Sequence, residues 1–272
     1  MKHLYILLLA SLLIYPSCTS GQQKESTITS QPESSNIASA PEEAVKDTVI
    51  PFEIKEFKAE KGDNKLEVEY PISGNPILLA SVRTWINELL GGTYRGNPDD
   101  ADAFFRHYSL QLGTDPELNE YGGYTIDIFK KAYENDLVLT YDYTTYVYEG
   151  GAHGMGGVYG TTFLRSDGSI FDRQCFKSYK PLHSLFIEGL KQYFKVKTDE
   201  ELAECLSNPS SLTKLSDPGM KPWITGDGVM FSYTPYEIAP YSAGSPRFAI
   251  PFEKLRPYLT EKGLQFFISD EE

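Results

Sequence analysis

The chain has 272 residues, with 25 Lys and Arg against 38 Asp and Glu, a net charge of −13. That length can bury a sizeable core, in one large domain or two small ones. The acidic balance excludes nucleic acid as a partner, because phosphate backbones are bound by clustered positive charge. Net acidity keeps an exported protein soluble, and it would also attract cationic partners over long range.

Residues 1–17 have the pattern of a secretory signal peptide: Lys2, an apolar run over 4–14, then small or turn residues. The apolar run is too short to be a spanning helix with normal flanks. Cys18 stands at the cleavage position and predicts lipoprotein processing, with a palmitate-bearing lipid on this first mature residue. Pro16 departs from the usual lipobox, so secretion without a lipid is the alternative.

Residues 18–49 are mostly Ser, Gln, Glu, Pro and Thr, which cannot bury enough apolar surface to offset ordering. We expect a disordered tether there. Loss of the signal removes one lysine and leaves a mature charge of 24 − 38 = −14. The expected location is the cell envelope, on a bacterial outer membrane, facing the periplasm or the outside. Membrane contact would be through the lipid anchor only.

The folded part begins near residue 50. Two strands are predicted over 52–60 and 65–70, because apolar and polar residues alternate around a Gly-Asp-Asn turn. Asn75, followed by proline, predicts a helix start, and a Gly-Gly pair ends that helix. Asn97 is likewise followed by proline and predicts the start of a second helix, with three aspartates near its N-terminus.

From residue 124 the apolar period changes to two, and strands are predicted over 124–128, 137–147 and 158–165. A helix over 181–193 follows, then a short helix opened by a Thr198–Glu201 capping box. Further segments follow in this order: a surface loop over 208–228, strands over 229–233 and 247–250, and a helix over 252–259. Because helices and strands are grouped, the predicted fold is α+β, an antiparallel sheet with helices packed on one side.

Five of the eight residues from 150 to 157 are glycine, and they lie between two aromatic-rich strands. Such a cluster indicates backbone in tight or left-handed geometry. His153 stands inside this loop, with Glu149 just before it. These two side chains could form an acid–base set with Glu237, which would make the protein a peptidoglycan-directed hydrolase or deacetylase. A histidine that only bonds to backbone in a crowded turn is the simpler interpretation.

The sequence contains no nucleophile beside a base, no phosphate-binding loop and no pair of histidines at ligand spacing. We therefore expect no catalytic residue, no metal site and no cofactor. Cys175 and Cys205 could form a disulfide outside the cytoplasm or remain two free thiols.

Tyrosine and phenylalanine are abundant, with 19 and 15 residues. Aromatic side chains give rigid contact surfaces for proteins and sugars, although most of them fill cores. The candidate ligand-binding residues lie in the glycine loop and in a second distinctive stretch near 236–244. They are Tyr148, Glu149, His153, Tyr236, Glu237 and Tyr241.

Several stretches resemble a domain of unknown function that is widespread in bacterial envelopes. They are Tyr-Glu-Gly-Gly-Ala-His-Gly at 148–154, Tyr-Glu-Ile-Ala-Pro-Tyr-Ser-Ala-Gly at 236–244 and Phe-Ala-Ile-Pro at 248–251. Tyr-Pro-Ile-Ser-Gly at 70–74 and Trp-Ile-Asn-Glu at 85–88 are similar to the companion domain that usually precedes it. The resemblance implies a companion subdomain over 50–120, a signature domain over 121–260 and a tail over 261–272.

The resembled family includes the extracytoplasmic part of lysozyme-sensing anti-sigma factors and the non-catalytic front part of peptidoglycan N-deacetylases. This sequence has neither a sigma-binding segment nor a deacetylase domain with paired metal histidines. The resemblance therefore implies an envelope role in which binding is the activity. We expect the partner to be a cationic, lysozyme-like protein or a peptidoglycan fragment. A purely structural envelope module is the other alternative.

Overall fold

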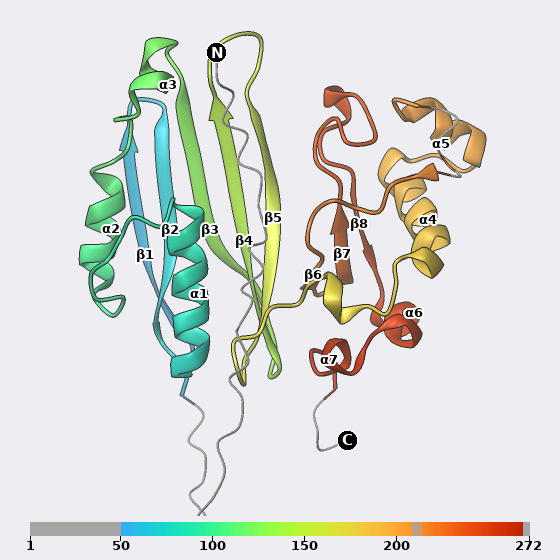
Figure 1. Ribbon diagram of the computed structural model, residues 1–272, viewed down its shortest axis with the longest axis horizontal. Coiled ribbons are helices and arrows are strands. Elements are labelled where there is room, and N and C mark those ends of the chain that lie inside the picture. The colour runs from blue at the N-terminus through green and yellow to red at the C-terminus, as the bar shows by residue number, and fades with distance from the viewer. Residues whose placement is uncertain (1–49, 209–211, 213, 269–272) are drawn as a thin grey trace, which may run out of the picture. The chain divides into compact units, whose positions relative to one another are not determined.

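The computed structural model describes residues 50–208, 212 and 214–268 (Figure 1). The expected signal peptide, the expected lipidation site Cys18 and the expected tether lie outside these residues. Contacts group Thr48–Glu272 into one compact unit. The described part is a mixed α+β fold built on two sheets, where the sequence predicted one.

The larger sheet has five strands in the order β1-β2-β3-β4-β5. Their bounds are β1 (Glu53–Lys61), β2 (Asn64–Ser73), β3 (Tyr124–Glu134), β4 (Val138–Tyr148) and β5 (Met155–Leu164). β2 and β3 run parallel, whereas every other neighbouring pair is antiparallel. The expectation of an antiparallel sheet is therefore wrong at this pair. The expected domain boundary between residues 120 and 121 separates β2 from β3 in sequence, yet these two strands are neighbours in the same sheet.

Three helices separate β2 from β3: α1 (Pro76–Leu89), α2 (Ala101–Ser109) and α3 (Pro116–Glu120). Asn75 caps α1 as predicted, since its side chain accepts a hydrogen bond from the Ile77 amide at 2.9 Å. The cap of α2 is Asp100, not Asn97. The Asn97 side chain instead accepts from the Asp99 amide at 3.0 Å and forms a turn before the helix.

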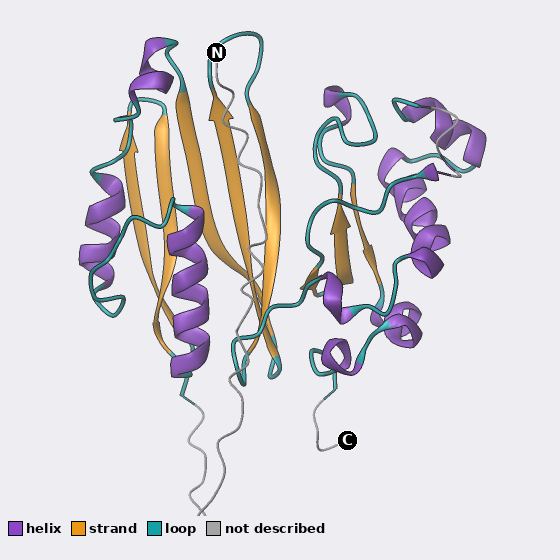
Figure 2. Cartoon of the chain, viewed as in Figure 1, coloured by secondary structure: helices purple, strands orange, loops and turns teal. Residues whose placement is uncertain are grey.

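Helices α1 and α2 share one apolar cluster with β2, β3, β4 and β5, and so cover one face of the larger sheet (Figure 2). The partly buried Trp85 of α1 packs against this cluster, with edge contacts to Tyr141 at 6.1 Å and to Phe163 at 5.8 Å between ring centroids. No helix among the described residues is long and apolar enough to cross a membrane.

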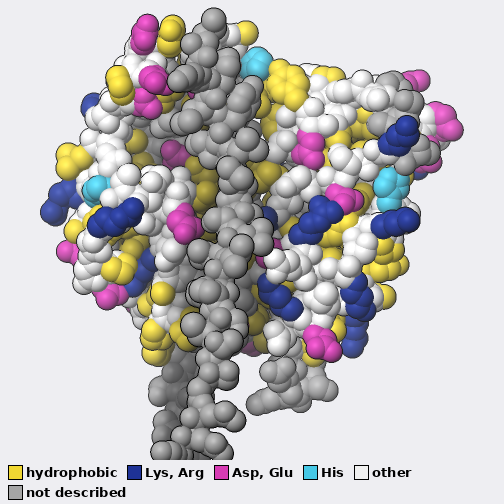
Figure 3. Space-filling model, viewed as in Figure 1, with side chains coloured by type: hydrophobic (Ala, Val, Ile, Leu, Met, Phe, Trp, Pro, Cys, Tyr) yellow, Lys and Arg dark blue, Asp and Glu magenta, His cyan; other side chains and the backbone are white. Residues whose placement is uncertain are grey.

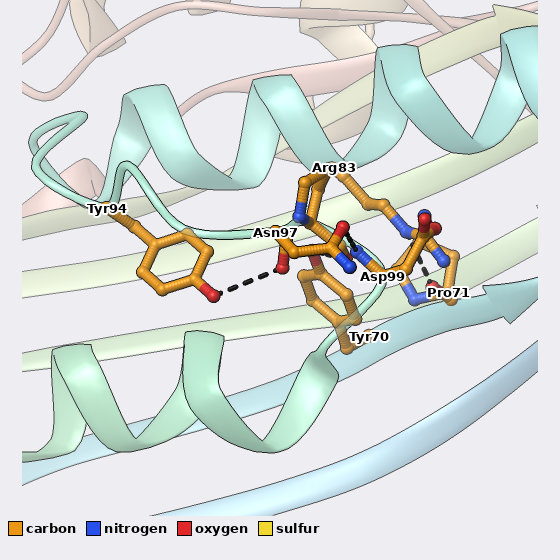
Figure 4. Close-up of polar contacts among 7 residues, drawn as sticks. Tyr70, Pro71, Arg83, Tyr94, Asn97 and Asp99 are labelled. Carbon is orange, nitrogen blue, oxygen red and sulfur yellow. Dashed lines mark hydrogen bonds and ion pairs between the residues drawn. The ribbon is translucent and has the colours of Figure 1, made fainter.

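A polar cluster fastens the segment before α2 to α1 and β2 (Figure 4). Arg83 is only 7% exposed; its guanidinium donates to the Pro71 carbonyl at 3.0 Å and forms an ion pair with Asp99. The Tyr70 hydroxyl donates to the Pro98 carbonyl at 2.8 Å, and burial raises the pKa of this tyrosine. Asp99, expected near a helix start, is thus the partner of a buried cation.

The smaller sheet has the order β6-β7-β8 and a hydrophobic core of its own. Its strands are β6 (Trp223–Thr225), β7 (Gly228–Ser232) and β8 (Arg247–Ile250). The helices of this region are α4 (His183–Phe194), α5 (Asp199–Cys205), α6 (Phe252–Leu255) and α7 (Glu261–Leu264). The Thr198–Glu201 capping box at the start of α5 is confirmed.

Two expected surface segments contribute to this core. Trp223 and Ile224 lie in the stretch expected to be a surface loop, yet they are only 3% and 4% exposed. Phe266 lies in the expected tail and is 1% exposed, with its ring 5.2 Å from that of Phe171. Both predictions failed because polar turn residues surround short apolar segments that are buried by distant parts of the chain.

Two buried hydrogen bonds join the two sheets, and a third links the two threonines that make them. Thr140 of β4 donates from its hydroxyl to the Ile224 carbonyl at 2.8 Å, and the Ile224 amide donates to the Thr162 hydroxyl at 2.7 Å. The two hydroxyls are 2.7 Å apart. Thr140 and Thr162 lie on the strand face opposite Tyr141 and Phe163, so β6 meets the face that α1 does not cover.

Glycines in β5 make room for close contacts with neighbouring segments. A Cβ atom at Gly160 would lie 2.0 Å from the Trp223 ring, and one at Gly156 would lie 2.8 Å from the Cα atom of Tyr146. These glycines belong to the strand and not to a loop. Only 149–154 separate β4 from β5, so the predicted glycine loop is shorter than its composition indicated.

Replacement of Gly160 by alanine should destabilise the protein by about 1–3 kcal/mol, because the buried Trp223 ring must shift away from the new methyl group. Urea unfolding followed by tryptophan fluorescence measures the change. Gly226→Ala is the matched control, since its Cβ would lie 3.8 Å from the nearest atom. Equal unfolding midpoints for the two variants would contradict the packing argument.

Candidate functional site

The loop between β4 and β5 meets the 236–241 segment in an aromatic cluster of His153, Tyr236 and Tyr241, here called the His153 cluster. The His153 ring stacks on Tyr241, with centroids 3.9 Å apart and planes 16° from parallel. The Tyr241 hydroxyl donates to the Gly154 carbonyl at 2.7 Å. The cluster thus brings together three of the six candidate residues, from segments far apart in sequence.

The hydrogen bonds of His153 define its tautomer. Nδ1 lies 3.0 Å from the Gly154 carbonyl oxygen, which can only accept, so Nδ1 carries the proton. In the neutral ring Nε2 is then an acceptor, and it lies 3.3 Å from the Tyr236 hydroxyl. The imidazole is therefore fixed on both edges, while the residue as a whole remains exposed.

Tyr236 occupies an unusual backbone position. The Glu237 amide donates to the Thr234 carbonyl at 3.1 Å, which closes a turn with Pro235 second and Tyr236 third. The φ of Tyr236 is +69°, the value that a type II turn requires at its third position and that glycine or asparagine normally supplies. A bulky side chain there is strained, and this one is 55% exposed.

Glu237 does not join the cluster as an acid–base group. One of its carboxylate oxygens accepts from the Thr234 amide at 2.8 Å and from the Thr234 hydroxyl at 3.0 Å. The other accepts from the Gly219 amide at 2.9 Å. This carboxylate therefore braces the turn that carries Tyr236 and ties it to the segment before β6.

The remaining two candidates also lie outside the cluster. Tyr148 donates its hydroxyl to the Gly151 carbonyl at 2.8 Å, which holds the β4–β5 loop. Glu149 is exposed, and within the described part of the chain no hydrogen bond or ion pair reaches it. His153 is hydrogen-bonded to neither Glu149 nor Glu237, so the acid–base set of the alternative interpretation is not assembled in this structure.

The alternative of a disulfide between Cys175 and Cys205 is wrong for this structure, since both thiols are free. Cys175 is buried beside Gly263 of α7, and burial raises the pKa of its thiol. The Cys205 thiol donates to the Glu201 carbonyl on its own helix at 3.4 Å. No group of three or more metal-ligating side chains is found in the ranges that the structure describes.

Sequence reasoning missed two partly buried carboxylates on the larger sheet. Asp127 of β3 accepts hydrogen bonds from the Tyr143 hydroxyl at 2.6 Å and the Thr145 hydroxyl at 3.1 Å, but burial dominates and raises its pKa. Asp142 shares its strand face with Thr140, and one of its carboxylate oxygens is buried without a hydrogen bond. Burial raises the pKa of Asp142, and the charge of Arg247 lowers it in part. The strict alternation of β4 places Asp142 inward and is the signal that could have found it.

The raised pKa of Asp142 makes a pH dependence predictable. As pH rises, the unfolded chain loses this proton before the folded chain does, so stability falls between the unfolded and folded pKa values. Asp142→Asn removes this loss, and the variant should therefore unfold at higher urea concentration than the wild type at pH 7. The advantage should shrink below about pH 4, where the carboxyl is protonated in both states. Urea titrations at several pH values measure it, with the exposed Glu149→Gln as control; a pH-independent difference would contradict the assignment.

Comparison with protein families matches one segment in the C-terminal half of the chain. The family model described as protein of unknown function (DUF3298) matches residues 176–253, which contain Tyr236 and Tyr241 but not His153. A search of curated proteins found no match.

Two solved structures share the fold. A DUF3298 family member from Bacteroides fragilis is 19% identical, with a TM-score of 0.58 over 79% of this chain and 95% of its own. A DUF3298 family protein from Pseudomonas aeruginosa is 18% identical, with a TM-score of 0.52 over 81% of this chain and 97% of its own. Residues 176–253 therefore match a DUF3298 family domain, in a chain whose fold resembles those of two DUF3298 family proteins.

Proposed function

We propose that this protein is a lipid-anchored envelope protein that binds its ligand at the His153 cluster without turning it over. The observation that carries the proposal is Tyr236, an exposed ring held in a left-handed turn position where glycine would fold more easily. Strain of this kind persists only where surrounding contacts enforce it, and it gathers at ligand sites. Here the enforcing contacts are the Glu237 carboxylate and the stacked His153 and Tyr241 rings.

The chemistry of the cluster suits two ligand classes. Stacked aromatic rings offer flat apolar faces with polar rims, to which sugar rings bind. The same faces attract Lys and Arg side chains. A peptidoglycan fragment and a cationic, lysozyme-like protein are therefore the candidate ligands. The chain has 38 acidic against 25 basic residues, and this excess of negative charge favours the approach of the cationic protein.

Charge alone gives no docking site. Figure 3 shows Lys, Arg, Asp and Glu side chains interspersed over the visible face, with no large patch of one sign. Long-range attraction would bring a cationic protein close, but the aromatic cluster would have to select it.

Binding without turnover is the simplest activity for these residues. The Glu237 carboxylate already accepts three hydrogen bonds, so its lone pairs are largely committed to the fold. His153 has no carboxylate partner within hydrogen-bond distance among the described residues, and the alternative acid–base set of Glu149, His153 and Glu237 requires one.

Tyr236→Asn tests the proposal directly. Asparagine tolerates positive φ, so the variant should be at least as stable as the wild type. Ligand affinity should fall at least about tenfold, since an exposed aromatic anchor is lost. Calorimetry against lysozyme and against purified muropeptides measures affinity, and urea unfolding measures stability. Leu110→Asn is the control, because Leu110 is 72% exposed and lies outside the cluster.

Unchanged affinity in Tyr236→Asn would contradict this site. A wild-type protein that binds neither ligand class, even at millimolar concentration, would contradict the proposed function itself. A purely structural module would show that second result, together with a loss of stability in His153→Ala.

Anchoring is tested separately with Cys18→Ser. If Cys18 carries the lipid, the wild type should sediment with membranes and the variant should appear in the soluble fraction, because a serine hydroxyl cannot take the thioether-linked lipid. Membrane fractionation and metabolic labelling with palmitate measure this. Cys205→Ser should remain membrane-bound and serves as the control.

A further inference from the structure

The outer edge of β1 is an unpaired strand edge. β1 is the first strand of the larger sheet, and its other side pairs with β2 through a hairpin in which Lys61 and Asn64 flank the two turn residues. In such a hairpin the flanking pair is hydrogen-bonded, and bonded pairs alternate along the strands. The main chains of residues 55, 57, 59 and 61 therefore face β2, and those of 54, 56, 58 and 60 face outward. Within the described residues no hydrogen bond reaches the outward set.

Charge follows a mirrored order along this edge. Glu53 and Glu56 precede Phe57, and Lys58 and Lys61 follow it, at equal distances on either side. We propose that β1 pairs antiparallel with β1 of a second copy of this chain, about a two-fold axis through Phe57. This inference does not depend on the proposed ligand site.

The two-fold pairing sets opposite charges face to face. Glu56 lies opposite Lys58 of the second copy, and Glu53 lies opposite Lys61 of the second copy, each pair occurring twice by symmetry. Residues 56 and 58 pair with each other across the axis, and so do residues 54 and 60. These are hydrogen-bonded pairs, because the amides and carbonyls of these four residues face outward.

The centre of the pairing is apolar. Phe57 is half-buried and stacked on Phe105 of α2, with ring centroids 4.8 Å apart. In the dimer it meets Phe57 of the second copy as a non-hydrogen-bonded pair, the closest kind of cross-strand contact. Lys55 lies opposite Ala59 and keeps its ion pair with Asp102 at 2.7 Å. No like charges meet in this register.

Neighbouring registers are rejected by the same charges. A shift of two residues in one direction places Glu56 opposite Glu56, and in the other direction it places Lys58 opposite Lys58. Larger shifts leave only residues 53–57, or only residues 57–61, paired between the two copies, so fewer backbone hydrogen bonds form. Charges on an edge strand usually prevent association. Here they disfavour the neighbouring registers and favour one, which is the arrangement expected of a specific interface.

Charge reversal tests the register. The protein should be the full chain with Cys18→Ser, so that a lipid anchor cannot bring copies together, and sedimentation velocity should show a dimer. Glu56→Lys and Lys58→Glu should each weaken the dimer at least about tenfold, because each converts two attractive pairs into repulsive ones. An equimolar mixture of the two variants should restore a one-to-one dimer, since lysine 56 of one then faces glutamate 58 of the other.

The mixture separates pairing from folding, because a misfolded variant could not be rescued by its partner. Glu120→Lys is the control for net charge: it is exposed on α3 and should leave the dimer unchanged. A wild-type monomer at the highest soluble concentration, single reversals that leave dimerisation unchanged, or a mixture without heterodimer would each overturn the proposal.

Discussion

The double burial of β4 is the constraint on which the rest of the structure depends. Its residues 138–141 are all buried, although successive side chains of a strand point to opposite faces. Leu139 and Tyr141 pack with the helices on one face, and Thr140 meets β6 on the other. Where such a strand packs against the backbone of another element, the buried amide and carbonyl groups of that backbone need hydrogen-bond partners from side chains. Thr140 and Thr162 supply these partners and bond both the amide and the carbonyl of Ile224.

The position of the His153 cluster follows from this arrangement. Once β6 is fixed against β4 and β5, the chain after β7 returns toward the far ends of the same two strands. Gly160 leaves room on β5 for the Trp223 ring of β6, which holds the two sheets close together. The cluster is then closed by hydrogen bonds to one carbonyl, that of Gly154, which accepts from both Tyr241 and His153. Packing alone accounts for the His153–Tyr241 stack. The exposed Tyr236 ring is the part of the cluster that a ligand could contact.

Local features were predictable from the sequence because they depend on neighbouring residues. The cap at Asn75, the capping box at Thr198 and the alternation in β4 are all of this type. The parallel pairing of β2 with β3 was not predictable, because three helices intervene and strand order is decided by distant contacts. The hydrogen bonds of Glu237 were not predictable for a related reason: its carboxylate accepts from the backbone amides of Thr234 and Gly219, and Gly219 is distant in sequence. His153, Tyr236 and Tyr241 were named as candidates because they lie in the two distinctive stretches, but their mutual contacts depend on the tertiary fold.

The left-handed turn at Tyr236 has a consequence for how this domain diverges. A mutation to glycine or asparagine there relieves backbone strain, so folding tolerates the loss of tyrosine. Such mutations are free to accumulate wherever the ring has no other use. Among related chains, the residue at this turn should therefore divide those under pressure to keep an aromatic contact from those that have lost it. The residue type at this one turn position thus indicates, for any homologue whose turn can be aligned, whether the aromatic contact is still required.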